Sequence, residues 1–122
     1  MTMILNLLPS LISGAENPLT TISKSVGITG TFDTGGNSDV DTTAEALTAT
    51  SFTCTQGVMI TAAEDNSGLI YIGNSDVTAA AADSTTGIPI SGGESLFFSA
   101  NNPSSIYVIA SAVNQACFWL AV

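Results

Sequence analysis

The chain has 122 residues, which fits a single domain, and its ten acidic residues outnumber one lysine, so the formal net charge is −9. This balance excludes nucleic-acid binding and docking on anionic membranes, because both need clusters of lysine and arginine. With no histidine in the sequence, Ser-His-Asp and Cys-His nucleophilic sites and histidine–cysteine zinc sites are excluded too.

Residues 1–24 are predicted to form an apolar N-terminal arm ahead of a single folded domain at residues 25–122. Large aliphatic residues recur there at helical spacing, but Pro9 interrupts a helix, so we expect an extended or one-turn arm. These residues are Ile4, Leu5, Leu8, Leu11 and Ile12. No positive charge precedes the apolar run at residues 1–12, so it is not a signal peptide, and it is too short to cross a bilayer as a helix. We expect it to pack on an apolar surface of its own domain or of a neighbouring chain.

The next segment combines a predicted strand with a predicted loop. Apolar and polar residues alternate at 25–32, which predicts a half-buried strand. Residues 33–43 are polar and glycine-rich and are predicted to form a loop, and residues 43–47 are compatible with one helical turn.

Acidic and amide side chains around this loop form the best candidate calcium site in the sequence. The candidate ligands are Asp33, Asn37, Asp39, Asp41 and Glu45. Calcium prefers several oxygen ligands on one flexible loop, but the spacing does not match an EF-hand. Solvated turn residues are the better explanation, so we assign no metal site.

The remaining sequence is a series of short predicted strands. Phe52, Cys54, Val58 and Ile60 share one parity, which is the cleanest two-residue alternation in the chain. A turn at residues 64–68 follows. Further strands are predicted near 69–73, 95–99, 105–111 and 116–122, while the alanine-rich segment 78–86 is ambiguous. This spacing predicts an all-β fold, an antiparallel β-sandwich or small barrel of jelly-roll or Ig-like type.

Two of these strands, Leu69–Ile72 and Phe118–Leu120, are apolar on both faces. Such strands are either central in a sheet or covered on the outer face by another chain. Tyr71, Tyr107 and Trp119 resemble a set that stacks on sugars, but packing inside the strands explains them better.

No pair of residues in the sequence indicates nucleophilic chemistry. Cys54 and Cys117 are predicted to be small buried hydrophobic residues. The sequence does not decide whether they form a disulfide. Neither cysteine has a neighbouring cation that would activate its thiol. A serine–lysine pair would have to use Lys24, whose serine neighbours would point to opposite faces of a strand.

Three segments of the C-terminal half have turn residues at fixed places. They are Ile70–Thr78 (IYIGNSDVT), Gly87–Leu96 (GIPISGGESL) and Ile106–Ser111 (IYVIAS). The first segment has a turn at Asn74-Ser75-Asp76, and the second has Pro89, which suits an edge strand or bulge, and a predicted tight reversal at Gly92-Gly93.

These segments resemble small structural proteins of tailed bacteriophages. The shared pattern is a strand ending in Tyr-Ile/Val-Gly, a Ser-Asp-Val-Thr turn, a Gly-x-Pro element, a Gly-Glu-Ser-Leu strand and Ile-Tyr-Val-Ile-Ala. Residues 1–65 carry no such resemblance, and the run Ala79–Ala82 lengthens the turn relative to the usual pattern.

The resemblance implies a non-enzymatic virion protein without cofactors, a decoration or cement protein on the capsid surface that bridges major capsid subunits. We expect a homo-oligomer, with a trimer favoured, and no nucleic-acid or membrane partner. The expected contact residues are Ile4, Leu5, Leu8, Leu11, Ile12, Tyr71 and Trp119. Two alternatives stay open: a tail, neck or fibre-base component of the virion, and a β-sandwich that binds host glycans.

Overall fold

The computed structural model describes residues 31–122, in which Phe32–Val122 form one compact unit. The predicted arm at residues 1–24, with Lys24 and the five aliphatic contact residues, lies outside the described residues. So does most of the predicted strand at 25–32, whose last two residues, Thr31 and Phe32, precede the first strand of the structure.

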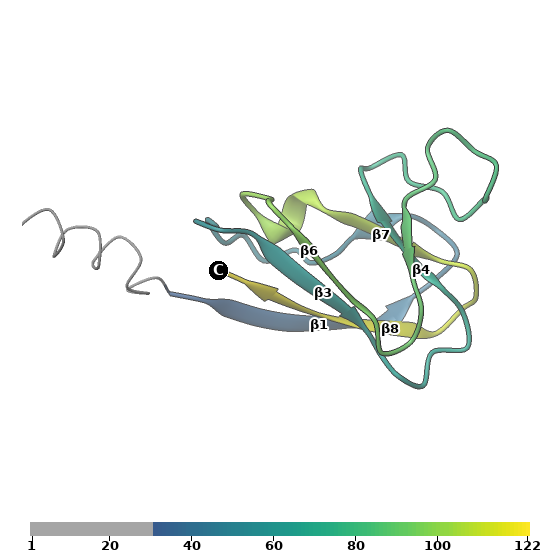
Figure 1. Ribbon diagram of the computed structural model, residues 1–122, viewed down its shortest axis with the longest axis horizontal. Helices are drawn as coiled ribbons and strands as arrows, with labels where there is room; N and C mark the ends of the chain where they lie inside the picture. Colours follow the sequence, from purple (N-terminus) through teal and green to yellow (C-terminus); the bar gives the residue numbers. More distant parts are fainter. Residues whose placement is uncertain (1–30) are drawn as a thin grey trace, which may run out of the picture. The chain divides into compact units, whose positions relative to one another are not determined.

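The described residues fold into eight β-strands and one short 3-10 helix (Figure 1). The elements are β1 (Asp33–Val40), β2 (Glu45–Ala46), β3 (Val58–Ala62), β4 (Ile70–Gly73), β5 (Ile88–Ile90), β6 (Ser95–Phe98), η1 (Pro103–Ser105), β7 (Tyr107–Ala110) and β8 (Gln115–Ala121).

The strands form two four-stranded antiparallel sheets, ordered β1-β8-β3-β6 and β2-β7-β4-β5. Strands therefore pair from the outside inwards along the chain: β1 with β8, β2 with β7, β3 with β6 and β4 with β5. This is a long two-stranded ribbon, closed at the β4–β5 connection and wrapped so that its halves lie in two sheets. Eight strands connected in this way make a jelly roll. The predicted all-β sandwich is confirmed, and the jelly-roll alternative is the one that fits the strand order.

The main hydrophobic core lies between the two sheets. The first sheet contributes alternate residues of its central strands, such as Ile60 and Trp119, and the second contributes Ile70, Ile72 and Val108. In β3 and β8 the buried residues alternate with more exposed ones, as a two-residue period requires.

Several predicted elements are confirmed. The strands near 69–73, 95–99, 105–111 and 116–122 correspond to β4, β6, β7 and β8. Pro89 lies in β5, an edge strand of the second sheet, which is where a residue without an N–H is tolerated in a sheet. Gly93 has a φ of 83° in the turn before β6, but this turn connects strands of different sheets instead of closing a hairpin.

The prediction of a loop at residues 33–43 is wrong for most of its length, because Asp33–Val40 form β1. This strand lies at the edge of its sheet and pairs with β8, with a register shift between Asn37 and Val40. Gly35 lies opposite Trp119 and Gly36 opposite Phe118, so the glycines leave space for two large aromatic rings. Polar, glycine-rich composition here reflects an edge strand packed against aromatic side chains.

The interpretation of residues 43–47 as one helical turn is also wrong. Glu45 and Ala46 form β2, which pairs with Val108 and Tyr107, and the N–H of Leu47 donates to the carbonyl of Ile106 at 2.8 Å. Pairing with β7 outweighs the helical preference of so short an alanine-containing segment. The ambiguous segment 78–86 consists of turns flanked by a bridge between Thr78 and Thr86.

The alternation that begins at Phe52 becomes a regular strand only at Val58. Phe52 and Cys54 pack against the core, as their parity predicts, but they are not in a strand. The N–H groups of residues 55–57 all donate to the carbonyl of Val122, which bends the chain away from a regular ladder.

Candidate functional site

The two sheets differ in how their outer faces are covered. On the sheet β2-β7-β4-β5, Tyr71 lies opposite Ile109, and both pack with Val77 in a second hydrophobic cluster. Val77 belongs to the segment after β4, which turns back through a hydrogen bond from its N–H to the carbonyl of Asn74 at 2.9 Å. The chain thus covers this outer face with its own residues.

The outer face of the sheet β1-β8-β3-β6 has no such cover within residues 31–122. Phe97 and Phe118 are 52% and 55% exposed, and Met59 is also exposed. Met59 lies directly opposite Phe97 on β6 and opposite Leu120 on β8, while Phe118 lies opposite Thr61 in the next row. We call this surface the apolar face. Its members are Thr34, Gly36, Met59, Thr61, Ser95, Phe97, Phe118 and Leu120.

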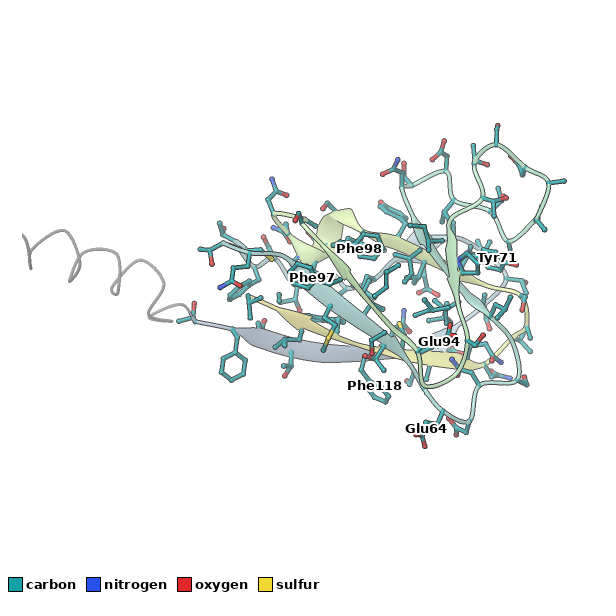
Figure 2. All side chains as sticks on the ribbon, in the orientation of Figure 1. Glu64, Tyr71, Glu94, Phe97, Phe98 and Phe118 are labelled. Carbon is teal, nitrogen blue, oxygen red and sulfur yellow. The ribbon has the colours of Figure 1, made fainter. Side chains whose placement is uncertain are left out.

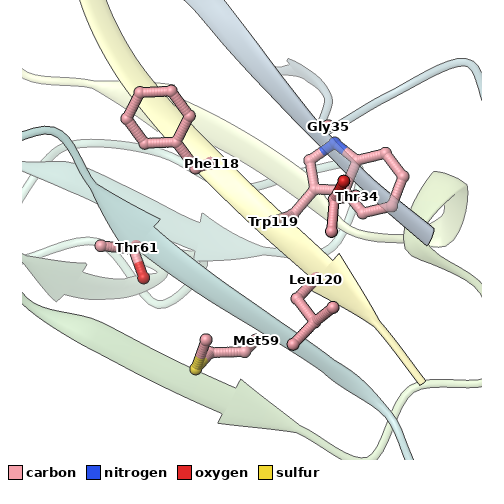
Figure 3. Close-up of a pocket in the computed structure, with 7 residues that line it drawn as sticks. All are labelled: Thr34, Gly35, Met59, Thr61, Phe118, Trp119 and Leu120. Atoms are coloured by element: carbon pink, nitrogen blue, oxygen red, sulfur yellow. The ribbon is translucent and has the colours of Figure 1, made fainter. Parts of the chain in front are cut away.

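The apolar face contains a hollow of about 350 Å³ (Figure 3). Its apolar lining includes Met59, Phe118, Trp119 and Leu120, and Gly35 and the short side chains of Thr34 and Thr61 complete it. A hollow with these walls can receive a large apolar side chain of a partner, which is the usual arrangement of an interface anchor.

Acidic side chains flank one end of the apolar face. Glu64 and Asp65 follow β3, and Glu94 precedes β6, where Thr61 and Ser95 lie opposite each other. All three acidic residues are exposed, and Figure 2 shows Glu64 and Phe118 at the lower edge of the view. The carboxylate of Glu94 also accepts a hydrogen bond from the N–H of Ser91 at 2.8 Å.

The candidate calcium ligands do not lie on one flexible loop. Asp33, Asn37 and Asp39 are in β1, Asp41 directly follows it, and Glu45 is in β2. Asn37 donates a hydrogen bond to Glu45 at 3.2 Å, and the carboxylate of Asp41 accepts one from the N–H of Asn114 at 3.0 Å. Among residues 31–122 the structure brings no three acidic or cysteine side chains together at metal-binding distance.

The three aromatic residues considered for sugar stacking do not share a surface. Tyr71 and Tyr107 belong to the cluster outside the second sheet, whereas Trp119 is in the core between the sheets. Of the expected contact residues, Tyr71 is 7% exposed and Trp119 is 5% exposed, and Trp119 is among the residues that line the hollow on the apolar face. The exposed rings nearby are Phe97 and Phe118, which the sequence analysis did not single out.

Both cysteines are free thiols. Cys117 is buried in the core, and burial raises the pKa of its thiol to about 11, so it stays protonated at neutral pH. Burial also raises the pKa of Cys54, which packs at the edge of the core. These are the properties of small buried hydrophobic residues.

The described part of the chain, residues 31–122, has no helix long and apolar enough to span a membrane. No protein-family model, curated protein or solved structure matches the sequence or the fold of this chain.

Proposed function

We propose that this chain is a non-enzymatic structural protein of a virion, a decoration or cement protein on the capsid surface that bridges major capsid subunits. The observation that carries the proposal is the difference between the two sheets. Within residues 31–122, one outer face is covered by the chain itself, and the other exposes Met59, Phe97 and Phe118 together. A contiguous exposed apolar face on a small domain marks a surface for protein contact.

The proposed mechanism is the burial of apolar surface across joints between capsid subunits. At about 25 cal/mol per Å², each copy contributes a modest contact energy, and repetition over the lattice makes the total large. An outer location also suits the charge of −9, because packaged nucleic acid would repel the protein.

The resemblance to phage structural proteins supports the same assignment. Its segments include β4, β5 and β7, which are three of the four strands of the second sheet, and the first two residues of β6 at the edge of the first sheet. The resemblance therefore concerns the scaffold that holds the apolar face. A homo-oligomer, with a trimer favoured, belongs to the same proposal.

Copy number in purified particles tests this function. Quantitative mass spectrometry of virions of the phage that encodes the chain should find on the order of hundreds of copies, because decoration follows the capsid lattice symmetry. A dozen copies or fewer would assign the protein to the tail, neck or fibre base. Its absence from particles would contradict a virion role altogether.

A further inference from the structure

The acidic residues of the chain are concentrated in the described domain, and this restricts the kind of protein surface that can cover the apolar face. Every acidic residue except Glu16 lies within residues 31–122, whereas the single basic residue, Lys24, does not. The described domain therefore has no lysine or arginine with which to balance its carboxylates.

Three of these carboxylates are next to the apolar face. Glu64 and Asp65 continue from β3, and Glu94 leads into β6, so they flank the row of Thr61, Ser95 and Phe118. A partner that covers Phe118 brings its own surface close to this acidic end. Like charges across an interface are unfavourable, and opposite charges favour association and fix its orientation.

We propose that the apolar face docks on a different protein, whose contact surface has an apolar centre and lysine or arginine side chains opposite Glu64, Asp65 and Glu94. This inference rests on the proposed function, in which that protein is the major capsid protein. One apolar side chain of the partner enters the hollow between Met59, Phe118 and Leu120.

A second copy of the chain is a poorer occupant of this face. A two-fold contact places the same patch on both sides, so each acidic end would face another surface that, within residues 31–122, carries no basic residue. At this face the apolar gain would then be opposed by repulsion of the acidic end, so the homo-oligomer of the proposed function uses another surface of the chain.

The experiment measures binding of the full chain to particles of the encoding phage that were produced without it. Phe118→Ser should weaken binding at least about tenfold, because it removes one wall of the hollow and a central aromatic contact. The matched control is Val113→Ser, since Val113 is 56% exposed but lies in the turn between β7 and β8. Both substitutions are at exposed positions, and an unchanged melting temperature verifies that each variant folds.

A pair of charge variants tests the chemistry of the partner. Glu64→Lys and Asp76→Lys change the net charge equally, but Asp76 lies in the turn after β4, on the other sheet. Glu64→Lys should weaken binding several-fold more than Asp76→Lys, and added salt should weaken wild-type binding and reduce this difference.

The outcomes separate the two proposals. If the wild-type chain binds particles and Phe118→Ser binds as tightly as Val113→Ser, the apolar face is not the docking surface, although the virion role stands. If the wild-type chain does not bind, the proposed function fails. If sedimentation instead shows self-association that Phe118→Ser abolishes, the occupant is a second copy, and the inference of a basic partner is overturned.

Discussion

Trp119 and Gly35 form the contact that joins the edge strand β1 to the core. They lie opposite each other in the β1–β8 ladder, and the indole ring occupies the space where a side chain at residue 35 would be. A Cβ atom added to Gly35 would lie 2.6 Å from a carbon of the Trp119 ring, well inside van der Waals contact. Gly35 is therefore required for space, since its φ is not in the left-handed region.

Gly35→Ala should destabilise the fold by about 1–3 kcal/mol, because the buried ring has to move in a packed core. The control is Gly36→Ala on the outer side of the same strand, where the nearest atom is 3.2 Å away on the exposed ring of Phe118. That variant should stay within about 0.5 kcal/mol of wild type. Urea unfolding followed by the fluorescence of Trp119, the single tryptophan, measures both. Equal losses in the two variants would contradict the steric explanation.

The thiol of Cys117 should make stability depend on pH in the alkaline range. Its pKa is raised from 9.0 to about 11 by burial, so the folded state disfavours the thiolate relative to the unfolded state. The folded state then binds the proton more tightly, and stability falls as pH rises above 9.0 until it levels off near pH 11. The full loss is about 2–3 kcal/mol.

Cys117→Ala provides the control for this pH dependence. The variant loses some packing at all pH values, but it cannot ionise, so its unfolding free energy should fall less steeply between pH 9 and 11 than that of wild type. Urea denaturation at pH 8, 9, 10 and 11 compares the slopes. Parallel curves for the two proteins would show that Cys117 does not carry the effect.

At the scale of elements, one buried glutamine attaches the turn between β3 and β4 to the start of β8. Gln115 is the buried polar residue of the described core, at 2% exposure. Its side-chain amide donates to the carbonyl of Val113 at 2.7 Å and to the hydroxyl of Ser67 at 3.2 Å, and its oxygen accepts from the N–H of Gly68 at 2.8 Å. The three bonds satisfy the buried side-chain amide of Gln115, which would otherwise lack partners in the core.

Gln115→Met keeps the length of the side chain and removes all three hydrogen bonds, so it should destabilise the protein by about 1–3 kcal/mol. The matched control is Gln56→Met at an exposed position, where the change should be within about 0.5 kcal/mol. Hydrogen exchange adds a local measurement, since the N–H of Gly68 should lose protection in the Gln115 variant alone. Unchanged protection there would mean that the amide of Gln115 does not hold the turn.

The sequence predicts some of these elements well, and the reasons for its failures are physical. β4, β6, β7 and β8 are predictable because runs such as Ile70–Ile72 combine β-branched and aromatic residues between turn residues. β1 is not predictable from the sequence, because glycine by itself does not favour a strand. Gly35 and Gly36 suit this strand because they leave space for the rings of Trp119 and Phe118, which belong to a strand far along the chain. β2 is too short to have any period of its own.

The candidate site shows the same limit. The run Phe118–Leu120 indicates that an aromatic residue faces outwards, but which one depends on the pairing of β8 with β1 and β3. The small buried residues Cys117 and Ala121 share the parity of Trp119, and this is the signal that could have identified Phe118 as exposed. Phe97 carries no such signal, because Phe98 beside it is equally large.

At the scale of the whole molecule, the wrapped ribbon brings strands from both ends of the described chain together, so the fold depends on packing between sheets. The described domain also carries carboxylates with no lysine or arginine among residues 31–122. Its electrostatic contribution to folding is therefore dominated by repulsion, which unfolding relieves by separating the charges. Hydrophobic burial between the sheets has to offset that repulsion as well as conformational entropy.

Salt should consequently stabilise this protein. Raising sodium chloride from 0.01 M to 0.15 M shortens the screening length from about 30 Å to about 8 Å, which weakens repulsion between carboxylates on different strands. We expect a gain of about 1 kcal/mol, or about 4–8 °C in melting temperature for a domain of this size. Thermal unfolding of the full chain at constant pH measures the shift.

The control separates screening from specific ion effects. Sodium chloride and sodium fluoride at equal ionic strength should give the same shift over this range, because screening depends on ionic strength alone. Glu64→Gln combined with Asp76→Gln removes two exposed carboxylates and should reduce the salt-dependent gain while raising the melting temperature at 0.01 M. A melting temperature that stays constant or falls with salt would mean that attractive contacts of the carboxylates outweigh their mutual repulsion. The acidic surface would then stabilise the free domain, and its charge would not need to be balanced by a basic partner.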